Sequence, residues 1–146
     1  MQVDFYHLAA SPLESVLARI AGRLIADGGR LLVVADDDAL LARLDGALWT
    51  HAADSFLPHG RSGAGRDPLQ PVLLSRDAVA SNDARNVALV DGLWRDDALA
   101  FDRAFHFFDD GSIEAARAAW RGLADRAGVE RRFWKQDEDG RWAQLA

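Results

Sequence analysis

The stretch RLLVVADDDALLARLDGALW, residues 30–49, has the pattern of a buried strand that leads directly into a helix. Residues 30–35 are almost entirely apolar, which is typical of a strand covered on both faces of a sheet. Asp36 and Asp37 can cap the helix that follows. Leucines recur at helical spacing through this helix, to about Trp49. A buried strand with an amphipathic helix beside it predicts an α/β fold.

Strands and helices continue to alternate on either side of this stretch. Five more segments have the composition of strands, the last of them at a sheet edge: 3–8, 71–75, 86–91, 103–109 and 129–135. Capping residues and apolar spacing predict further helices at 12–27, 95–102 and 112–128. Residues 50–71 are expected to form a long loop. This order predicts one mostly parallel sheet with helices on both faces, a Rossmann-like three-layer sandwich.

Length and composition limit the classes of protein to which the chain can belong. A chain of 146 residues fits one domain with a single core, which we place at residues 1–135. Residues 136–146 are polar, and we expect them to form a mobile tail. Cysteine is absent, which excludes disulfides and thiolate metal sites. No apolar run reaches the roughly 20 residues of a membrane span, and no signal-peptide pattern is visible, so we expect a cytoplasmic protein.

Charge is unevenly distributed along the chain. The formal net charge is −6, and an acidic domain is a poor general binder of nucleic acids. Residues 112–135, however, carry six basic against three acidic side chains, so this segment has a net charge of +3 and the remainder −9. A cationic end on an anionic protein indicates a local acidic partner rather than a long polyanion.

A glycine-rich loop at residues 60–67, GRSGAGRD, is similar to the phosphate-binding loop G-x-x-x-x-G-K-[ST]. Such a loop needs a lysine for the phosphate oxygens and a helix whose N-terminus faces the phosphate. Here Arg66 replaces the lysine, Asp67 would repel phosphate, and the next expected element is a strand. We therefore predict a flexible crossover loop. An enzyme with a degenerate nucleotide site, either an NTP hydrolase or a phosphotransferase, remains as the alternative function.

Other candidate catalytic or metal-binding residues are more simply explained by structural roles. The four histidines lack metal-ligand spacing, and His7 and His106 lie in predicted strands. The run Asp36–Asp38 is better explained by helix capping and solubility than by a metal. A phospho-acceptor domain would need a lysine late in the sheet, and the only lysine is Lys135, near the end of the chain. We predict no catalytic residue, no metal and no cofactor.

The basic segment places cations beside an aromatic ring. Arg117 and Arg121 are four residues apart and share one helical face, with Trp120 beside them. Arginine can bind a carboxylate through two parallel hydrogen bonds, and Trp120 could form the wall of an apolar slot. Arg132 and Lys135, on the next strand, can extend this patch. The alternative is a solvated helix face with Trp120 partly in the core.

Six motifs follow one another in a familiar order: FYHL (5–8), RLLVVADDDALLARLDGALWT (30–50), DSFLPHG (54–60), PVLLS (71–75), NVALV (86–90) and ARAAWRGLADRAG (116–128). Together they resemble the chi subunit family of bacterial DNA polymerase III holoenzyme, over residues 3–135. The most specific part of the resemblance is LDGALW followed by SFLPH.

This resemblance implies a non-catalytic accessory protein. A chi subunit belongs to the clamp-loader assembly, whereas nucleotidyl transfer belongs to another subunit of the DNA-directed DNA polymerase complex. Its fold is similar to nucleotide-binding α/β folds but has no working nucleotide site. It binds the psi subunit of the clamp loader and the acidic C-terminal tail of single-stranded DNA-binding protein, and contacts DNA only indirectly and no membrane. These contacts would couple the replicase to coated single-stranded DNA in DNA replication.

Carried over by position, the resemblance implies two sets of site residues. The acidic tail would be bound by Trp49, Phe108, Arg117, Trp120 and Arg121, with help from Arg132 and Lys135. Arg117 would pair with the terminal carboxylate, the aromatic rings would line the pocket for the last side chain, and Arg121 would steer the acidic stretch. The psi subunit would contact Phe56, Leu57 and Pro58. One basic position of the family, a turn before Arg117, is Ile113 here.

Overall fold

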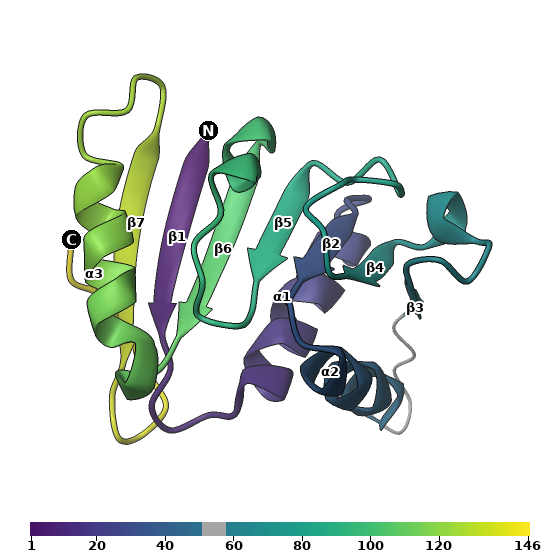
Figure 1. Ribbon diagram of the computed structural model, residues 1–146. Coiled ribbons are helices and arrows are strands. Elements are labelled where there is room, and N and C mark those ends of the chain that lie inside the picture. Colours follow the sequence, from purple (N-terminus) through teal and green to yellow (C-terminus); the bar gives the residue numbers. More distant parts are fainter. Residues whose placement is uncertain (51–57) are drawn as a thin grey trace.

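The strands form a single sheet in the order β3-β4-β2-β5-β6-β1-β7-β8, as the computed structural model shows (Figure 1). The structure describes residues 1–50 and 58–146. The strands are β1 Gln2–His7, β2 Leu31–Val34, β3 His59–Arg61, β4 Val72–Ser75, β5 Asn86–Leu89, β6 Arg103–Phe108, β7 Glu130–Gln136 and β8 Trp142–Gln144. Every neighbouring pair is parallel except β7 and β8. The prediction of an α/β protein with a mostly parallel sheet is confirmed, although strand order could not be predicted.

The described part of the chain contains three α-helices: α1 Leu13–Ala26, α2 Asp38–Thr50 and α3 Ile113–Gly122. It also contains three short 3-10 helices: η1 Asp67–Leu69, η2 Asp96–Ala100 and η3 Asp110–Ser112. In Figure 1, α3 lies in front of the sheet beside β7, whereas α2 lies toward the opposite end, near β4 and β3. None of these helices combines the length and the apolarity that crossing a bilayer would require.

Strand β2 lies inside the sheet and is buried on both faces. Its four residues have no exposed surface, and it pairs with β4 on one side and β5 on the other. Leu31 and Val33 pack in the cluster that includes buried residues of α1 and α2, whereas Leu32 and Val34 pack in the cluster that includes residues of α3. Each such side chain contributes about 1.5–3 kcal/mol on burial. The apolar run at residues 30–35 was therefore interpreted correctly.

Some predicted boundaries are wrong. The predicted loop at 50–71 contains β3 and η1, which the sequence did not reveal because β3 is only three residues long and reads HGR. The predicted helix at 112–128 ends at Gly122, a residue type that weakens helix interiors. The short helix expected at 95–102 is the 3-10 helix η2.

Residues 136–146 do not form the loose tail that we expected. Strand β8 pairs with β7, so β7 is not the edge of the sheet. The Trp142 ring lies 5.3 Å from the Tyr6 ring, centroid to centroid. The Gln136 side chain is 2% exposed and accepts hydrogen bonds from the backbone N–H groups of residues 9–11. Strand pairing, one aromatic ring and one buried amide together therefore attach a segment whose polar composition suggested no structure.

Candidate functional site

The exposed side of α3 carries two arginines beside a tryptophan, and we call Arg117, Trp120 and Arg121 the α3 face. Both arginines are exposed, as their spacing of four residues predicted, while Ala116 on the opposite side of the helix is fully buried. Arg117 forms an ion pair with Glu114 at 3.1 Å, and the Arg117 side chain keeps 54% of its surface exposed. Within the described residues Arg121 forms no ion pair. The helix therefore presents two accessible cations on one side.

Trp120 connects the α3 face to the core. Its ring packs edge-on against Phe5 and Phe133, with centroid distances of 5.4 and 5.6 Å. Phe133 in turn lies 5.5 Å from Phe108. Trp120 is half-buried, so it is neither fully in the core nor fully in solvent. The ring is thus held in one place while part of it stays accessible to a ligand.

Phe108 supports this region from below rather than forming part of its surface. Its side chain is 2% exposed and packs against the rings of Phe5, His7 and Phe133. Ile113, at the position where the family has a basic residue, packs partly buried against the same core cluster. Phe108 is therefore too buried to contribute much surface to a slot beside Trp120, contrary to our expectation, although it forms part of the wall of the cleft at the carboxyl ends of β1, β5 and β6.

Arg132 does not extend the α3 face. Strand alternation points Arg132 and Trp134 to the opposite side of the sheet from Phe133. There Arg132 pairs with Asp4 at 3.2 Å, and Asp4, which is 1% exposed, also accepts from Arg103 at 3.0 Å and from the Trp134 indole at 3.1 Å. Arg132 thus shares the Asp4 carboxylate with Arg103 on the side of the sheet away from Trp120, which corrects our prediction. Lys135 is exposed and has the same strand parity as Phe133.

Arg131, which precedes Arg132 in β7, lies against the α3 face. It was not singled out from the sequence. Its guanidinium carbon is 4.0 Å from the centroid of the Trp120 ring, and Arg131 donates a hydrogen bond to the Trp120 carbonyl oxygen. Strand alternation around Phe133 was the signal that could have identified Arg131. Residues two positions apart in a strand lie on the same side, so Arg131 shares the side of Phe133.

Trp49 lies at the other end of the molecule from the α3 face. It is 56% exposed in the last turn of α2, and its ring meets the buried His59 of β3 at 5.0 Å. Neighbouring strands are about 4.8 Å apart, so the six spacings from β3 to β7 correspond to roughly 29 Å. Trp49 and Trp120 therefore cannot line one pocket. Our assignment of Trp49 to the tail site was wrong because the sequence does not reveal strand order.

Trp49 instead shares the α2–β3 end, which we define as Trp49, Pro58 and His59. Pro58 is half-buried and directly precedes β3. The His59 ring forms a 3.0 Å contact with the Asp45 carboxylate, which joins β3 to α2. Phe56 and Leu57, which we expected to contact the psi subunit, lie outside the described residues.

The glycine-rich loop is closed by one of its own carboxylates. The Gly63 N–H donates to Asp67 at 3.1 Å, and the Ser62 hydroxyl donates to the same carboxylate at 3.0 Å. A phosphate would have to displace this internal anion. The helix that follows, η1, has only three residues and contains Pro68. This geometry disfavours phosphate binding in this loop.

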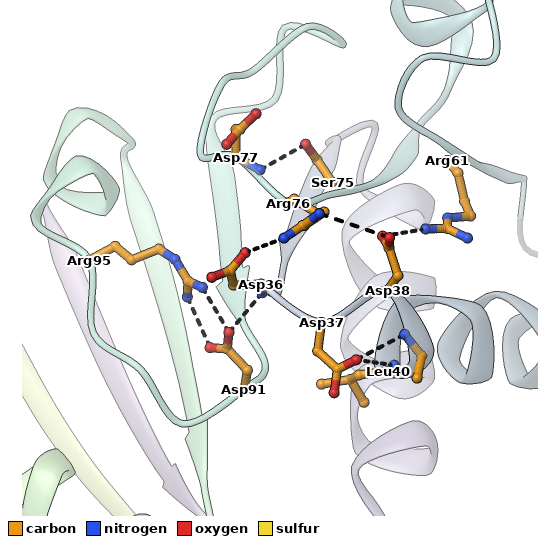
Figure 2. Close-up of polar contacts among 11 residues, drawn as sticks. Asp36, Asp37, Asp38, Leu40, Arg61, Ser75, Arg76, Asp77, Asp91 and Arg95 are labelled. Carbon is orange, nitrogen blue, oxygen red and sulfur yellow. Dashed lines mark hydrogen bonds and ion pairs between the residues drawn. The ribbon is translucent and has the colours of Figure 1, made fainter.

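The acidic run Asp36–Asp38 is compensated by arginines rather than arranged around a cation (Figure 2). Asp37 caps α2 by accepting from the Ala39 N–H at 2.9 Å. Asp36 pairs with Arg76 at 2.9 Å, and Asp38 pairs with Arg61 at 3.1 Å. Among residues 1–50 and 58–146, no group of three or more carboxylates or histidines is placed to hold a metal ion. Capping by Asp37 is confirmed, whereas Asp36 plays no such part.

Beside this run, Asp91 forms a two-bond ion pair with Arg95, with a shortest distance of 2.7 Å (Figure 2). Burial raises the pKa of Asp91, but hydrogen bonds from Arg95 and from the Asp36 N–H outweigh burial and keep that pKa below its ordinary value. The carboxylate thus stays ionised and joins the ends of β2 and β5 electrostatically.

A cleft of about 910 Å³ lies at the carboxyl ends of β1, β5 and β6, where open α/β sheets commonly bind ligands. Its charged lining residues are Glu14, Asp37, Arg43, Asp91 and Asp109. Arg43 is already paired with Glu14 at 2.9 Å. An excess of carboxylates on these walls disfavours a phosphate-bearing ligand.

The two histidines predicted to be structural are both buried. His7 is 5% exposed, and its Nε2 lies 2.7 Å from the Asp110 carboxylate. His106 is fully buried between aromatic rings, and neither ring nitrogen has a hydrogen-bond partner in the described structure. Burial lowers the pKa of His106 to about 4, so this ring is neutral at physiological pH.

Comparisons with known proteins agree with the arrangement of the motifs. Residues 1–130 match the family described as DNA polymerase III chi subunit, HolC. Among characterised relatives, DNA polymerase III subunit chi of Escherichia coli (strain K12) is 29% identical over 114 residues, which are 76% of this chain and 78% of that protein. The matched region includes α3 and ends at the first residue of β7.

Proposed function

The chain belongs to the DNA polymerase III chi subunit family, whose members take part in DNA replication. On this premise we propose that it is a non-catalytic accessory subunit of the clamp-loader assembly. Nucleotidyl transfer would reside in another subunit. The fold would be Rossmann-like and layered but without a working nucleotide site. The closed glycine loop and the acidic cleft support this lack of a nucleotide site.

The α3 face is proposed to bind the acidic C-terminal tail of single-stranded DNA-binding protein. The observation that carries this proposal is a pair of exposed arginines, one turn apart, beside the half-buried Trp120 in a protein whose net charge is −6. Arg117 would bind the terminal carboxylate, Trp120 would contact the last apolar side chain, and Arg121 would attract the preceding acidic residues. Lys135 would add to this attraction from β7.

The existing contacts of Arg117 do not prevent this role. The Arg117–Glu114 pair is exposed, and such pairs contribute at most about 1 kcal/mol. An incoming carboxylate can therefore replace Glu114 at little cost. For a short peptide at a shallow site we expect a Kd on the order of micromolar, weakened by salt.

The α2–β3 end is proposed to bind the psi subunit, together with Phe56 and Leu57 of the adjoining segment. Trp49 is a large apolar side chain with 56% of its surface exposed, and exposed tryptophans are frequent anchors of protein interfaces. Since this end is roughly 29 Å from β7, both partners could bind at once. The protein would thereby couple the clamp loader to coated single-stranded DNA.

The decisive experiment is a fluorescence-anisotropy titration with a labelled acidic peptide that ends in an aromatic residue and a free carboxylate. Arg117→Ala should weaken binding by about 1.5–3 kcal/mol, because a charged hydrogen bond is lost. Arg19→Ala, which removes an exposed arginine from α1, serves as the matched control and should bind like the wild type. Equal affinity of Arg117→Ala and wild type would refute the proposed site.

A further inference from the structure

Two arginines at this end of the sheet, Arg131 and Arg121, have no ion-pair partner among the described residues, which sets them apart from the other arginines there. Three of them have carboxylate partners: Arg117 pairs with Glu114, Arg126 with Asp96 and Arg132 with Asp4. Arg131 has no carboxylate within ion-pair distance among the residues that the structure describes. Its positive charge is therefore not neutralised by the protein.

Arg131 is nevertheless held in place. The guanidinium stacks on the Trp120 ring at 4.0 Å and donates to the Trp120 carbonyl oxygen, so one residue of α3 fixes both the plane and one end of the side chain. Trp120 is itself fixed by Phe5 and Phe133. An arginine ordered in advance loses less conformational entropy when it binds a ligand than a freely rotating one.

Arg131 and Arg117 both lie next to Trp120, but they come from different elements. Arg117 and Trp120 are three residues apart, so they are neighbours on the helix surface. Arg131 thus approaches the Trp120 ring from β7, whereas Arg117 lies one turn away on α3 with its guanidinium paired to Glu114 at 3.1 Å. A chain end bound there could place its ring beside the indole and its carboxylate at the Arg131 guanidinium.

We propose that Arg131 is a specificity-determining residue beside the α3 face. Arg131 binds the terminal carboxylate of an acidic peptide whose last side chain packs on Trp120. This inference rests on the proposed function of the α3 face. A planar guanidinium with most of its N–H donors unused can bind a carboxylate through two parallel hydrogen bonds. Because Arg131 lies just beyond the region that matches the family, this contact would be an addition to the shared part of the fold.

The test compares two peptides of identical sequence, one with a free terminal carboxylate and one with a terminal amide. Wild-type protein should bind the acid about tenfold more tightly than the amide. Arg131→Ala should weaken binding of the acid about tenfold and reduce the preference for acid over amide to about twofold. Arg131→Lys should not restore that preference, because lysine lacks the planar fork. Arg126→Ala, which removes an exposed paired arginine, should match the wild type.

Several outcomes would overturn the inference, and they differ from failure of the proposed function. If neither peptide binds wild-type protein, the proposed function fails and the inference with it. If Arg117→Ala weakens binding but Arg131→Ala does not, only the inference fails. If Arg131→Ala weakens acid and amide equally, Arg131 acts through general charge or through Trp120, and the inference is again wrong. Arg131→Met keeps an apolar stem on Trp120 and replaces the alanine variant if thermal melting shows that the latter is unfolded.

Discussion

The two ends of the sheet differ in the chemistry that they present. At the β7 end, the α3 face consists of exposed arginines around one half-buried ring. At the β3 end, Trp49 is an exposed ring, and the polar side chains of His59 and Asp45 beside it contact each other. The first surface suits an anionic chain end and the second suits an apolar interface. One sheet thus presents two unlike surfaces.

The cores beneath these surfaces also differ. His59 is buried under Trp49 but contacts the Asp45 carboxylate at 3.0 Å. His106, whose ring packs against Phe5 and Phe108 of the cluster that supports Trp120, is buried without any hydrogen-bond partner in the described structure. Protonation of His106 would place a charge in this buried position, so acid should destabilise the α3 half.

The largest expected effect is therefore the loss of stability at low pH through His106. Its pKa is about 4 in the folded protein and about 6.5 when unfolded, so between these values the unfolded chain binds more protons. The free energy of unfolding should fall by roughly 2–3 kcal/mol as pH drops from 7.5 to 4.5. Urea denaturation of wild type and His106→Phe at both pH values measures this contribution. Equal pH dependence in the two proteins would contradict the assignment.

Next in size is the effect of the exposed ring at the β3 end. Trp49→Ala should weaken binding of the psi subunit by about 2 kcal/mol, because it removes an interface anchor. Binding of the acidic peptide should change by less than about twofold, since Trp49 is remote from α3. Isothermal titration calorimetry with each ligand separates the two effects. A comparable loss of peptide affinity would return Trp49 to the tail site and abolish the contrast between the ends.

The smallest expected effect concerns Arg121. Arg121→Ala should weaken peptide binding by only about 0.5 kcal/mol, because an exposed cation acts through screened attraction. The variant should also show a shallower loss of affinity with added salt. Anisotropy titrations at two salt concentrations provide the comparison with Arg117→Ala. A loss as large as that of Arg117→Ala would mean that Arg121 makes a direct contact.

Local patterns allowed much of the fold to be predicted. The apolar run of β2 and the leucine spacing of α2 identified a buried strand and its helix, and the spacing of Arg117 and Arg121 identified an exposed basic helix face. These features depend only on residues close in sequence. By contrast, β3 has the sequence HGR, and its pairing with β4 depends on the surrounding structure rather than on its own composition.

The errors in the site have the same physical origin. Trp49 was grouped with Trp120 by position from the family resemblance, and no local pattern in the sequence contains the strand order that separates the two residues. Arg132 was chosen instead of Arg131, which shares the side of Phe133 that packs in the core cluster with α3. The adjacent Trp134 gives the other side of β7 a large apolar residue too, so alternation in the sequence left both sides possible. Phe108 was placed at the surface because burial depends on the rings that cover it.

The separation of the two surfaces is tested most directly by binding both ligands to one protein. The affinity of the labelled acidic peptide is measured by anisotropy, first with the protein alone and then with the protein saturated by the psi subunit. Two surfaces roughly 29 Å apart on one sheet should give the same Kd within about twofold, and a ternary complex. Displacement of the peptide by the psi subunit would contradict the account, because it would show that the two partners share one surface.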